Sequence, residues 1–485
     1  MQTTLWGRWR EMGEFADKLA AQSPAFQRAY LGSLAPSLVK SVKLEQYYET
    51  LTDFDFITAK INHPEFGVQP LIEDYDLIDH AETLNYPEYN SEKVKSLKLI
   101  QGALRLSAHI LVTDKQQLAS QLHGRLLNQQ MPEEIQALLA QIKQEKTTPW
   151  LCPLTPSLTP PGGRLLRTLK GHSSYVNAVA VTPNGQQVIS ASDDKTLKVW
   201  NLATGEEQFT LNGHSHSVNA VAVTPNGQQV ISASDDKTLK VWNLATGEEQ
   251  FTLNGHSSYV NAVAVTPNGQ QVISASDDKT LKVWNLATGK EGFFTFIRNL
   301  ITRRKIFTLK GHSDWVKAVA VTPNGQQVIS ASYDNTLKVW NLATGEEQFT
   351  LNGHSHWVNA VAVTPNGQQV ISASIDNTLK VWNLATGEEQ FTLNGHSSYV
   401  NAVAVTPNGQ QVISASYDNT LKVWNLATGE VIATFAGEGS IDCCAVAPDC
   451  MTIVAGDSSG RVHFLRLEGM REESRESNFI CQGFH

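Results

Sequence analysis

Histidine, serine and aspartate recur together along much of the chain, and these three residue types form the catalytic triad of many hydrolases. In the first copy they stand as His172, Ser190 or Ser192, and Asp194. Gly-His pairs return at residues 213, 255, 311, 353 and 395, followed by nearly the same letters. A catalytic serine needs an exposed hydroxyl beside an oxyanion hole. The recurrence therefore indicates either six hydrolase-like sites or six copies of a structural unit.

The elements that must position these residues repeat every 42 residues, with one longer interval of 56 between the third and fourth copies. Four runs of the first copy, at 175–181, 186–192, 196–202 and 206–212, are rich in β-branched and apolar residues. Turn signals such as Thr-Pro-Asn-Gly separate these runs, so each copy predicts four short strands. Apolar residues on both faces of the inner strands predict small antiparallel sheets that stack on their neighbours.

The Gly-His pair, the aspartate of Asp-Asp-Lys-Thr and the tryptophan of Val-Trp-Asn together resemble the WD-repeat signature. One departure is that Asn201, and not aspartate, follows Trp200. The resemblance implies a β-propeller in which a histidine, an aspartate, a strand serine and a tryptophan of each blade form a buried hydrogen-bond network. It places the structural network, in six successive blades, at His172, Asp194, Trp200; His214, Asp236, Trp242; His256, Asp278, Trp284; His312, Asp334, Trp340; His354, Asp376, Trp382; and His396, Asp418, Trp424. On this interpretation the triad is structural and catalysis is not expected.

The strand count predicts an all-β seven-bladed WD-repeat propeller, preceded by an all-α helical domain. A seventh, degraded copy starts at Gly437 and ends at its third strand, 461–467. Residues 165–169 match a fourth strand without a preceding blade, so we expect them to supply the missing outer strand and close the ring. In the last copy Glu438, Ser459 and Leu465 replace the histidine, aspartate and tryptophan. That blade is therefore predicted to rely on packing and on the closing strand, and to be the weak point of the ring.

The six copies differ at only a few positions, all in two loops that emerge on the same face of a propeller. Blades one to three carry acidic residues beside lysines there, and blades four to six carry aromatic residues. Exposed aromatic side chains are frequent anchors of protein interfaces, while recent duplication with neutral changes is the alternative explanation. The predicted partner-binding residues are Tyr175, Asn177, Asp193, Tyr259, Trp315, Lys317, Tyr333, Trp357, Ile375, Tyr399 and Tyr417.

An insertion at 290–305 lengthens the third copy by 14 residues. Its apolar residues follow helical spacing and its flank is basic, which predicts an amphipathic helix at 293–304. Such a helix can lie on an anionic membrane surface, which makes a peripheral membrane adaptor the alternative function. A helix folded back on the helical domain or on the third blade is the other interpretation.

Residues 1–146 predict a helical domain, followed by a proline-rich linker at 147–163, the propeller at 164–467 and a flexible tail at 468–485. Pro132 stands at a helix start, with Ile135, Leu138, Leu139 and Ile142 on one face. Residues 43–61 predict another helix. Segments within 45–150 resemble the helical linker of signal-transduction ATPases of the STAND, NB-ARC-type class, which includes the apoptotic protease-activating factor. That resemblance implies a bacterial protein and a role in signal transduction.

The chain contains no Gly-x-x-x-x-Gly-Lys-Ser/Thr phosphate loop, so any ATPase is expected to be supplied by another chain. A net charge of −9 without a basic block argues against nucleic acid as the partner. Five unevenly spaced cysteines predict neither a disulfide framework nor a metal site, and a cytoplasmic location is expected. We expect no cofactor.

The predicted function is a non-enzymatic scaffold or ligand-sensing module that binds a protein or peptide on the varied face.

Overall fold

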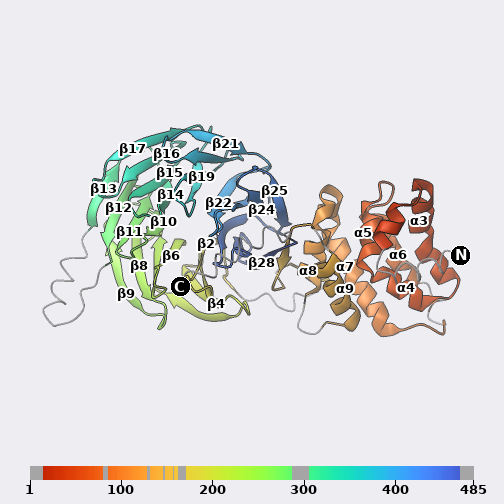
Figure 1. Cartoon of the computed structure of the whole chain (residues 1–485). Helices are drawn as coiled ribbons and strands as arrows, with labels where there is room; N and C mark the ends of the chain where they lie inside the picture. Colours follow the sequence, from red (N-terminus) through yellow and green to blue (C-terminus); the bar gives the residue numbers. More distant parts are fainter. Residues whose placement is uncertain are drawn as a thin grey trace. The chain divides into compact units, whose positions relative to one another are not determined.

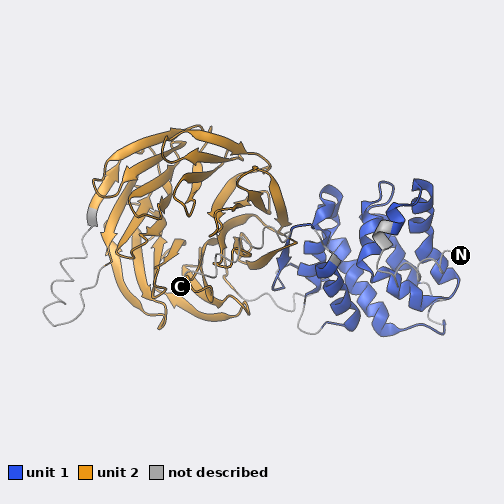
Figure 2. Ribbon diagram, in the orientation of Figure 1, with its two compact units in different colours: residues 1–166 blue, residues 167–485 orange. Residues whose placement is uncertain are grey.

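The computed structural model describes residues 15–79, 83, 86–127, 131–145, 148–156, 158–161, 171–286 and 305–469. The chain forms two compact units, residues 1–166 and 167–485 (Figure 2). The first is helical and the second is a ring of β-sheets (Figure 1). The expected propeller start at 164 lies close to this division.

Eight α-helices lie within the described part of the first unit, as expected for an all-α region. They are α2 (Phe15–Ala20), α3 (Pro24–Lys40), α4 (Leu44–Leu51), α5 (Phe54–Asn62), α6 (Val68–Asp76), α7 (Ser91–Thr113), α8 (Leu118–Leu126) and α9 (Glu133–Glu145). Helix α9 starts directly after Pro132, and its apolar face is buried as predicted. No helix of the described residues is both long enough and apolar enough to cross a membrane.

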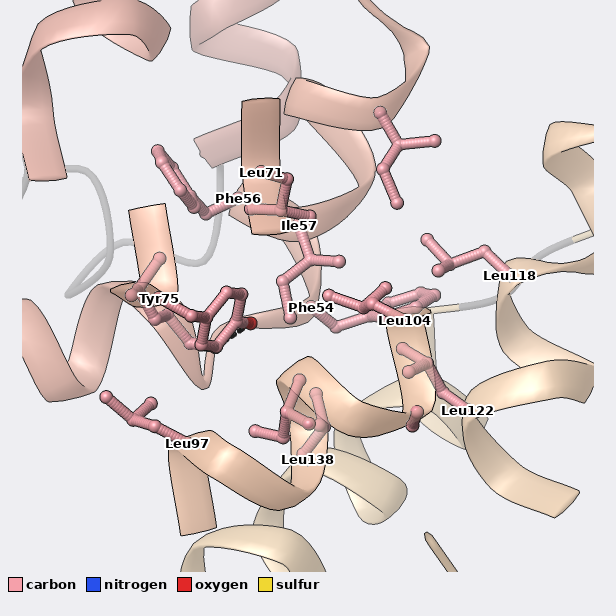
Figure 3. Close-up of a cluster of buried hydrophobic side chains, with 14 of the residues drawn as sticks. Phe54, Phe56, Ile57, Leu71, Tyr75, Leu97, Leu104, Leu118, Leu122 and Leu138 are labelled. Atoms are coloured by element: carbon pink, nitrogen blue, oxygen red, sulfur yellow. Dashed lines mark hydrogen bonds between the residues drawn. The ribbon is translucent and has the colours of Figure 1, made fainter. Parts of the chain in front are cut away.

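The single helix predicted over 43–61 is two helices, because α4 ends at Leu51 and Asp53 caps the start of α5. Asp53 has an extended backbone, and its Oδ1 accepts a hydrogen bond from the backbone N–H of Phe56 at 3.0 Å. This N-cap satisfies a donor at the start of α5 that has no partner inside the helix. The turn lets Phe56 and Ile57 of α5 join Leu71 and Tyr75 of α6 in the core of the unit (Figure 3).

Part of the predicted linker is ordered structure. Trp150–Pro153 forms strand β1, whose four residues are all buried. Trp150 and Cys152 belong to the core of the helical unit, and the hydroxyl of Ser120 on α8 donates to the carbonyl of Leu151 at 2.9 Å. The apolar residues Trp150 and Leu151 favour this burial over a solvated linker.

The first six sheets of the ring are antiparallel and have four strands in sequence order. They are β2 (Val176–Val181), β3 (Gln187–Ser192), β4 (Thr196–Asn201), β5 (Glu207–Asn212); β6 (Val218–Val223), β7 (Gln229–Ser234), β8 (Thr238–Asn243), β9 (Glu249–Asn254); β10 (Val260–Val265), β11 (Gln271–Ser276), β12 (Thr280–Asn285), β13 (Lys305–Lys310); β14 (Val316–Val321), β15 (Gln327–Ser332), β16 (Thr336–Asn341), β17 (Glu347–Asn352); β18 (Val358–Val363), β19 (Gln369–Ser374), β20 (Leu379–Asn383), β21 (Glu389–Leu393); and β22 (Val400–Val405), β23 (Gln411–Ser416), β24 (Thr420–Asn425), β25 (Val431–Ala436). The seventh contains β26 (Ile441–Val446), β27 (Thr452–Asp457) and β28 (Val462–Glu468).

The hydrophobic core of the ring lies between blades. One cluster joins Ile189 and Leu197 of the first blade to Val218 and Trp242 of the second, and similar clusters follow around the ring. Each sheet therefore covers the apolar face of the next, as the two-sided apolar pattern predicts. The prediction of a seven-bladed propeller is confirmed.

Direct packing between the last and first blades closes the ring. Val176 and Trp200 share a cluster with Cys443 and Phe464. The closing strand predicted at 165–169 lies outside the described residues. The observed closure thus depends on β2 packing against β26 and β27.

Candidate functional site

The histidine, serine, aspartate and tryptophan of each blade meet in one buried network. In the first blade Trp200 Nε1 donates to Ser190 Oγ at 2.8 Å, and the serine oxygen lies 2.6 Å from His172 Nε2. His172 Nδ1 lies 2.8 Å from Asp194 Oδ2. Since the indole only donates and the carboxylate only accepts, Nδ1 carries the proton and the serine hydroxyl donates to Nε2. Every polar atom in this chain of contacts has a partner.

This network cannot act as a hydrolase site in the conformation observed, because its serine is fully buried. Ser190 has 0% exposed surface, as do the corresponding serines of the other five blades. The Trp Nε1–Ser Oγ distances of those blades are 2.7–2.9 Å and the His Nδ1–Asp Oδ2 distances 2.7–2.8 Å. The structure therefore brings together all the residues assigned to the structural network.

Hydrogen bonds control the charge state of the network aspartates. Burial alone would raise the pKa of Asp194, but hydrogen bonds from His172 and Thr196 outweigh it and hold the pKa well below its usual value. Thr196 Oγ1 donates to Asp194 Oδ1 at 2.7 Å, and the backbone N–H of Ser173 donates to Oδ2 at 3.0 Å. An ionised aspartate is thus an integral part of each of these six blades.

The seventh blade contains a different polar network, which alignment of the repeat copies did not predict. Asp457 Oδ2 lies 3.0 Å from His463 Nε2, and both side chains are fully buried. Ser459 Oγ donates to Asp457 Oδ1 at 2.6 Å, and Arg461 forms an ion pair with Glu438. The seventh blade was predicted to rely on packing and on the closing strand, and that prediction did not include this buried polar network. The histidine occupies the strand position of a lysine in other blades, since His463 pairs with Ala455 where Lys198 pairs with Ser190.

The varied positions do expose aromatic rings. Trp315 and Trp357 are 44% and 40% exposed, whereas the network tryptophan Trp200 is only 2% exposed. Four predicted partner-binding tyrosines are also exposed, namely Tyr175, Tyr259, Tyr399 and Tyr417. Tyr333 and Ile375 are half-buried.

Three of these rings form an aromatic cluster, which we define as Trp315, Tyr333 and Trp357. Tyr333 stacks on Trp357 with centroids 4.2 Å apart and planes inclined by 10°, and Trp315 lies 5.7 Å from Tyr333. Lys317 Nζ stands 5.3 Å from the Tyr333 centroid, within range of a cation–π interaction. The cluster joins the fourth and fifth blades, whose sequences alone do not show that the rings meet.

Asn177 and Asp193 have structural contacts in addition to their place on the varied face. Asn177 Nδ2 donates to Asp193 Oδ1 at 2.7 Å and to the carbonyl of Val218 in the next blade at 3.1 Å. Asn219 makes the same pair of contacts to Asp235 and Val260. These asparagines therefore link neighbouring blades, which the partner-binding interpretation did not foresee.

The constancy of the opposite-face turns has a structural cause. Asn184 Oδ1 accepts from Thr182 Oγ1 at 2.7 Å and from the Gln186 N–H at 3.0 Å, while Gly185 has φ +66°. A positive φ of this size favours glycine. These turns are thus held by their own backbone geometry, so their invariance does not by itself identify the varied face as a binding surface.

The amphipathic helix predicted at 293–304 lies outside the described residues. The described chain leaves β12 at Asn285 and re-enters at Lys305 in β13, so the insertion interrupts the turn between the third and fourth strands of the third blade. Within the described residues, no group of three or more His, Cys, Asp or Glu side chains is arranged to hold a metal ion.

The sheets and their networks match one protein family. The WD40 family, described as WD domain, G-beta repeat, matches residues 163–201, 205–243, 247–285, 303–341, 345–383 and 387–425. The first six blades are WD40 repeats. The seventh blade of this WD40 propeller lies beyond the matched segments, consistent with its replaced network residues. Proteins with WD40 propellers generally are non-enzymatic scaffolds that bind protein partners.

Known relatives match short parts of the WD40 repeats. Nuclear distribution protein PAC1 of Candida albicans is 56% identical over 39 residues, 8% of each chain. Lissencephaly-1 homolog 1 of Paramecium tetraurelia is 36% identical over 103 residues, 20% of this chain and 23% of its own. Pre-mRNA-splicing factor prp46 of Aspergillus fumigatus is 42% identical over 50 residues, 10% of this chain and 11% of its own. The chain therefore spans less than a quarter of the length of any of these three relatives.

The relatives correct one expectation. They come from fungi and from Paramecium, which contradicts the expected bacterial origin. That expectation was drawn from the N-terminal helices, whereas these matches to known proteins are short segments at the scale of one or a few WD40 repeats.

Proposed function

We propose that this protein is a non-enzymatic interaction scaffold or ligand-sensing module that binds a protein or peptide partner on the varied face of its WD40 propeller. The observation that carries the proposal is the aromatic cluster, two of whose rings, Trp315 and Trp357, are exposed to solvent. Indole rings left in water give up the favourable free energy of burial. A partner that covers them would recover it, which is why tryptophan and tyrosine dominate interface energetics.

The distribution of exposed rings supports this surface. Tyr175, Tyr259, Tyr399 and Tyr417 lie on the same set of loops as Trp315 and Trp357. Each ring is attached to a backbone held by strand pairing on both sides, so little conformational entropy is lost when it is covered. A rigid surface with several amphipathic rings is suited to recognising a protein segment.

The names of the relatives also favour a scaffold. They denote a nuclear distribution protein, a lissencephaly-1 homolog and a pre-mRNA-splicing factor, and none names a catalytic activity. It stays a prediction that the partner is an ATPase on another chain and that the helical unit is the linker of such an ATPase. The same capture experiment addresses both.

The test compares protein capture by the full chain and by two variants. Trp315→Ala combined with Trp357→Ala removes the exposed indoles, and Val431→Ala truncates an exposed apolar residue that belongs to the outer strand β25. We expect the double variant to lose partners that the wild type and Val431→Ala retain, with a weakening of roughly 30-fold or more for hot-spot residues. Thermal unfolding of each variant checks that the fold is intact. Equal recovery of every partner by all three proteins would refute the proposed surface.

A further inference from the structure

Carboxylates gather at the inner-strand end of the varied face, on the blades that lack tryptophan there. We define the acidic arc as Asp442, Asp193, Asp235 and Asp277, which belong to the seventh, first, second and third blades. Asp235 and Asp277 accept hydrogen bonds from Asn219 and Asn261 at 2.6 Å and 2.5 Å. Neutral amides therefore hold these two carboxylates of the arc in place.

Lys317 shows which chemistry suits this surface. It replaces asparagine at one inner-strand position, and its Nζ donates to Asn261 Oδ1 at 3.2 Å while standing over the ring of Tyr333. Burial lowers the pKa of Lys317, and the carboxylates of Asp277 and Asp235 oppose that effect. The chain itself thus places a cation between an aromatic ring and the acidic arc on the side of the third and fourth blades.

At the opposite end of the arc, the side-chain hydrogen bonds that hold Asp442 come from neutral groups. Asp442 Oδ1 accepts from Asn401 Nδ2 at 3.1 Å and from Ser440 Oγ at 3.0 Å, both neutral groups. Burial raises the pKa of Asp442 to about 6, and the neighbouring carboxylates of Asp457 and Asp193 add to the rise. A positive charge placed here would relieve this repulsion.

Exposed tyrosines stand on both sides of this end of the arc. Tyr399 lies two residues before Asn401, the partner of Asp442, and its ring is 6.0 Å from that of Tyr417. Tyr175 lies two residues before Asn177, the partner of Asp193. An arginine side chain can pair with carboxylates through its planar N–H groups and stack on an aromatic ring at the same time.

We propose that the partner recognised by the varied face is a basic protein segment, whose arginine or lysine side chain pairs with Asp193 and Asp442 between the flanking tyrosines. This inference rests on the proposed function and adds the chemical class of the partner. Arginine is preferred over lysine, because its flat guanidinium group satisfies the carboxylates and the rings together.

The test selects a phage-displayed library of random twelve-residue peptides against the intact protein. Selected peptides are then synthesised with a fluorescent label, and their affinities are measured for the wild type and for variants. Asp193→Asn combined with Asp442→Asn removes both negative charges, while each substituted side chain keeps one oxygen that can accept a hydrogen bond. Glu206→Gln removes one carboxylate from an exposed turn of the opposite face and is the matched control. Thermal unfolding confirms that both variants are folded.

We expect arginine and lysine to be enriched in the selected peptides, and their affinity to fall roughly tenfold or more in the double Asp variant but not in Glu206→Gln. Two results would overturn this inference without contradicting the proposed function. Either the peptides whose binding requires Trp315 and Trp357 lack basic residues, or their affinity is unchanged in the double Asp variant. If no selected peptide depends on those two tryptophans, the proposed function fails and this inference fails with it.

Discussion

Asp457 and His463 form a buried pair inside the last blade, with 3.0 Å between Oδ2 and Nε2. They replace the four-residue network of the other blades with a different solution to the same problem. In both cases a buried carboxylate pairs with an imidazole nitrogen where water cannot reach. The pair makes the seventh blade depend on electrostatics as well as on packing.

Replacing His463 with Leu should destabilise the propeller strongly. Asp457 would keep its charge in a fully buried site without its main hydrogen-bond partner, and leaving a buried polar group without its partner costs about 1–3 kcal/mol, and more for a charged group. Urea unfolding followed by circular dichroism measures the change. As the control, Asp457→Asn in addition to His463→Leu should recover part of the loss; a single variant as stable as wild type would contradict the assignment.

Acid should destabilise the propeller between about pH 4 and pH 2. Burial raises the pKa of Asp457, but the hydrogen bond and charge of His463 outweigh it and set the pKa at about 2. An unfolded aspartate has a pKa of about 4, so the unfolded chain binds more protons as the pH falls and the free energy of unfolding drops. The six network aspartates act in the same direction.

Asp442 should have the opposite effect at higher pH. Its pKa is raised to about 6 in the folded protein, so the folded chain takes up a proton first as the pH falls from about 6 to about 4, and this contribution increases stability. Asp442→Asn should remove that rise without changing the decline below pH 4. Chemical unfolding at a series of pH values, for wild type and variant, separates the two.

Ser190→Ala should cost about 1–3 kcal/mol, because it leaves the Trp200 indole N–H and His172 Nε2 buried without a partner. Ser372→Ala, at the equivalent place in the fifth blade, should cost about the same.

A fluorophosphonate probe should leave Ser190 unmodified in the folded protein, and mass spectrometry of the treated chain checks this. Labelling of Ser190 would show that the network opens to solvent.

Exchanging one residue of a left-handed turn should change stability in a predictable direction. Lys237 has φ +69°, and Asn335 occupies the same place in the fourth blade with φ +68°. Asparagine tolerates this conformation better than lysine. Lys237→Asn should therefore stabilise the chain by roughly 0.5–1 kcal/mol, and the reciprocal Asn335→Lys should destabilise it by a similar amount, measured by thermal unfolding. Effects of the same sign in both would contradict this explanation.

Gly456→Ala should weaken the closure of the ring. An added Cβ would lie 2.5 Å from Val176 Cγ1 and 2.7 Å from Cys443 Sγ, closer than packed atoms allow. Overpacking of this kind typically costs about 1–3 kcal/mol. Val176→Ala in the same chain makes room and should offset part of the loss, which urea unfolding of the single and double variants would show.

The repeated features could be derived from the sequence alone, because they depend on local pattern and recur. Strand spacing, the turn residues and the network of His172, Ser190, Asp194 and Trp200 all lie within one blade, so six copies confirm one another. By contrast, the break at Asp53 depends on a side chain capping the backbone three residues on, which an apolar pattern does not reveal.

Only the tertiary structure decides the contacts that cross blades or replace the pattern. Cys443 Sγ lies 3.3 Å from the carbonyl of Val176, 267 positions earlier in the chain. Asn177 is committed in part to the carbonyl of Val218, and Tyr333 stacks on Trp357 of the next blade. His463 takes the role of the missing network residues from a neighbouring strand position. Such contacts depend on the distance between atoms of different sheets, and no periodicity along one chain encodes that distance.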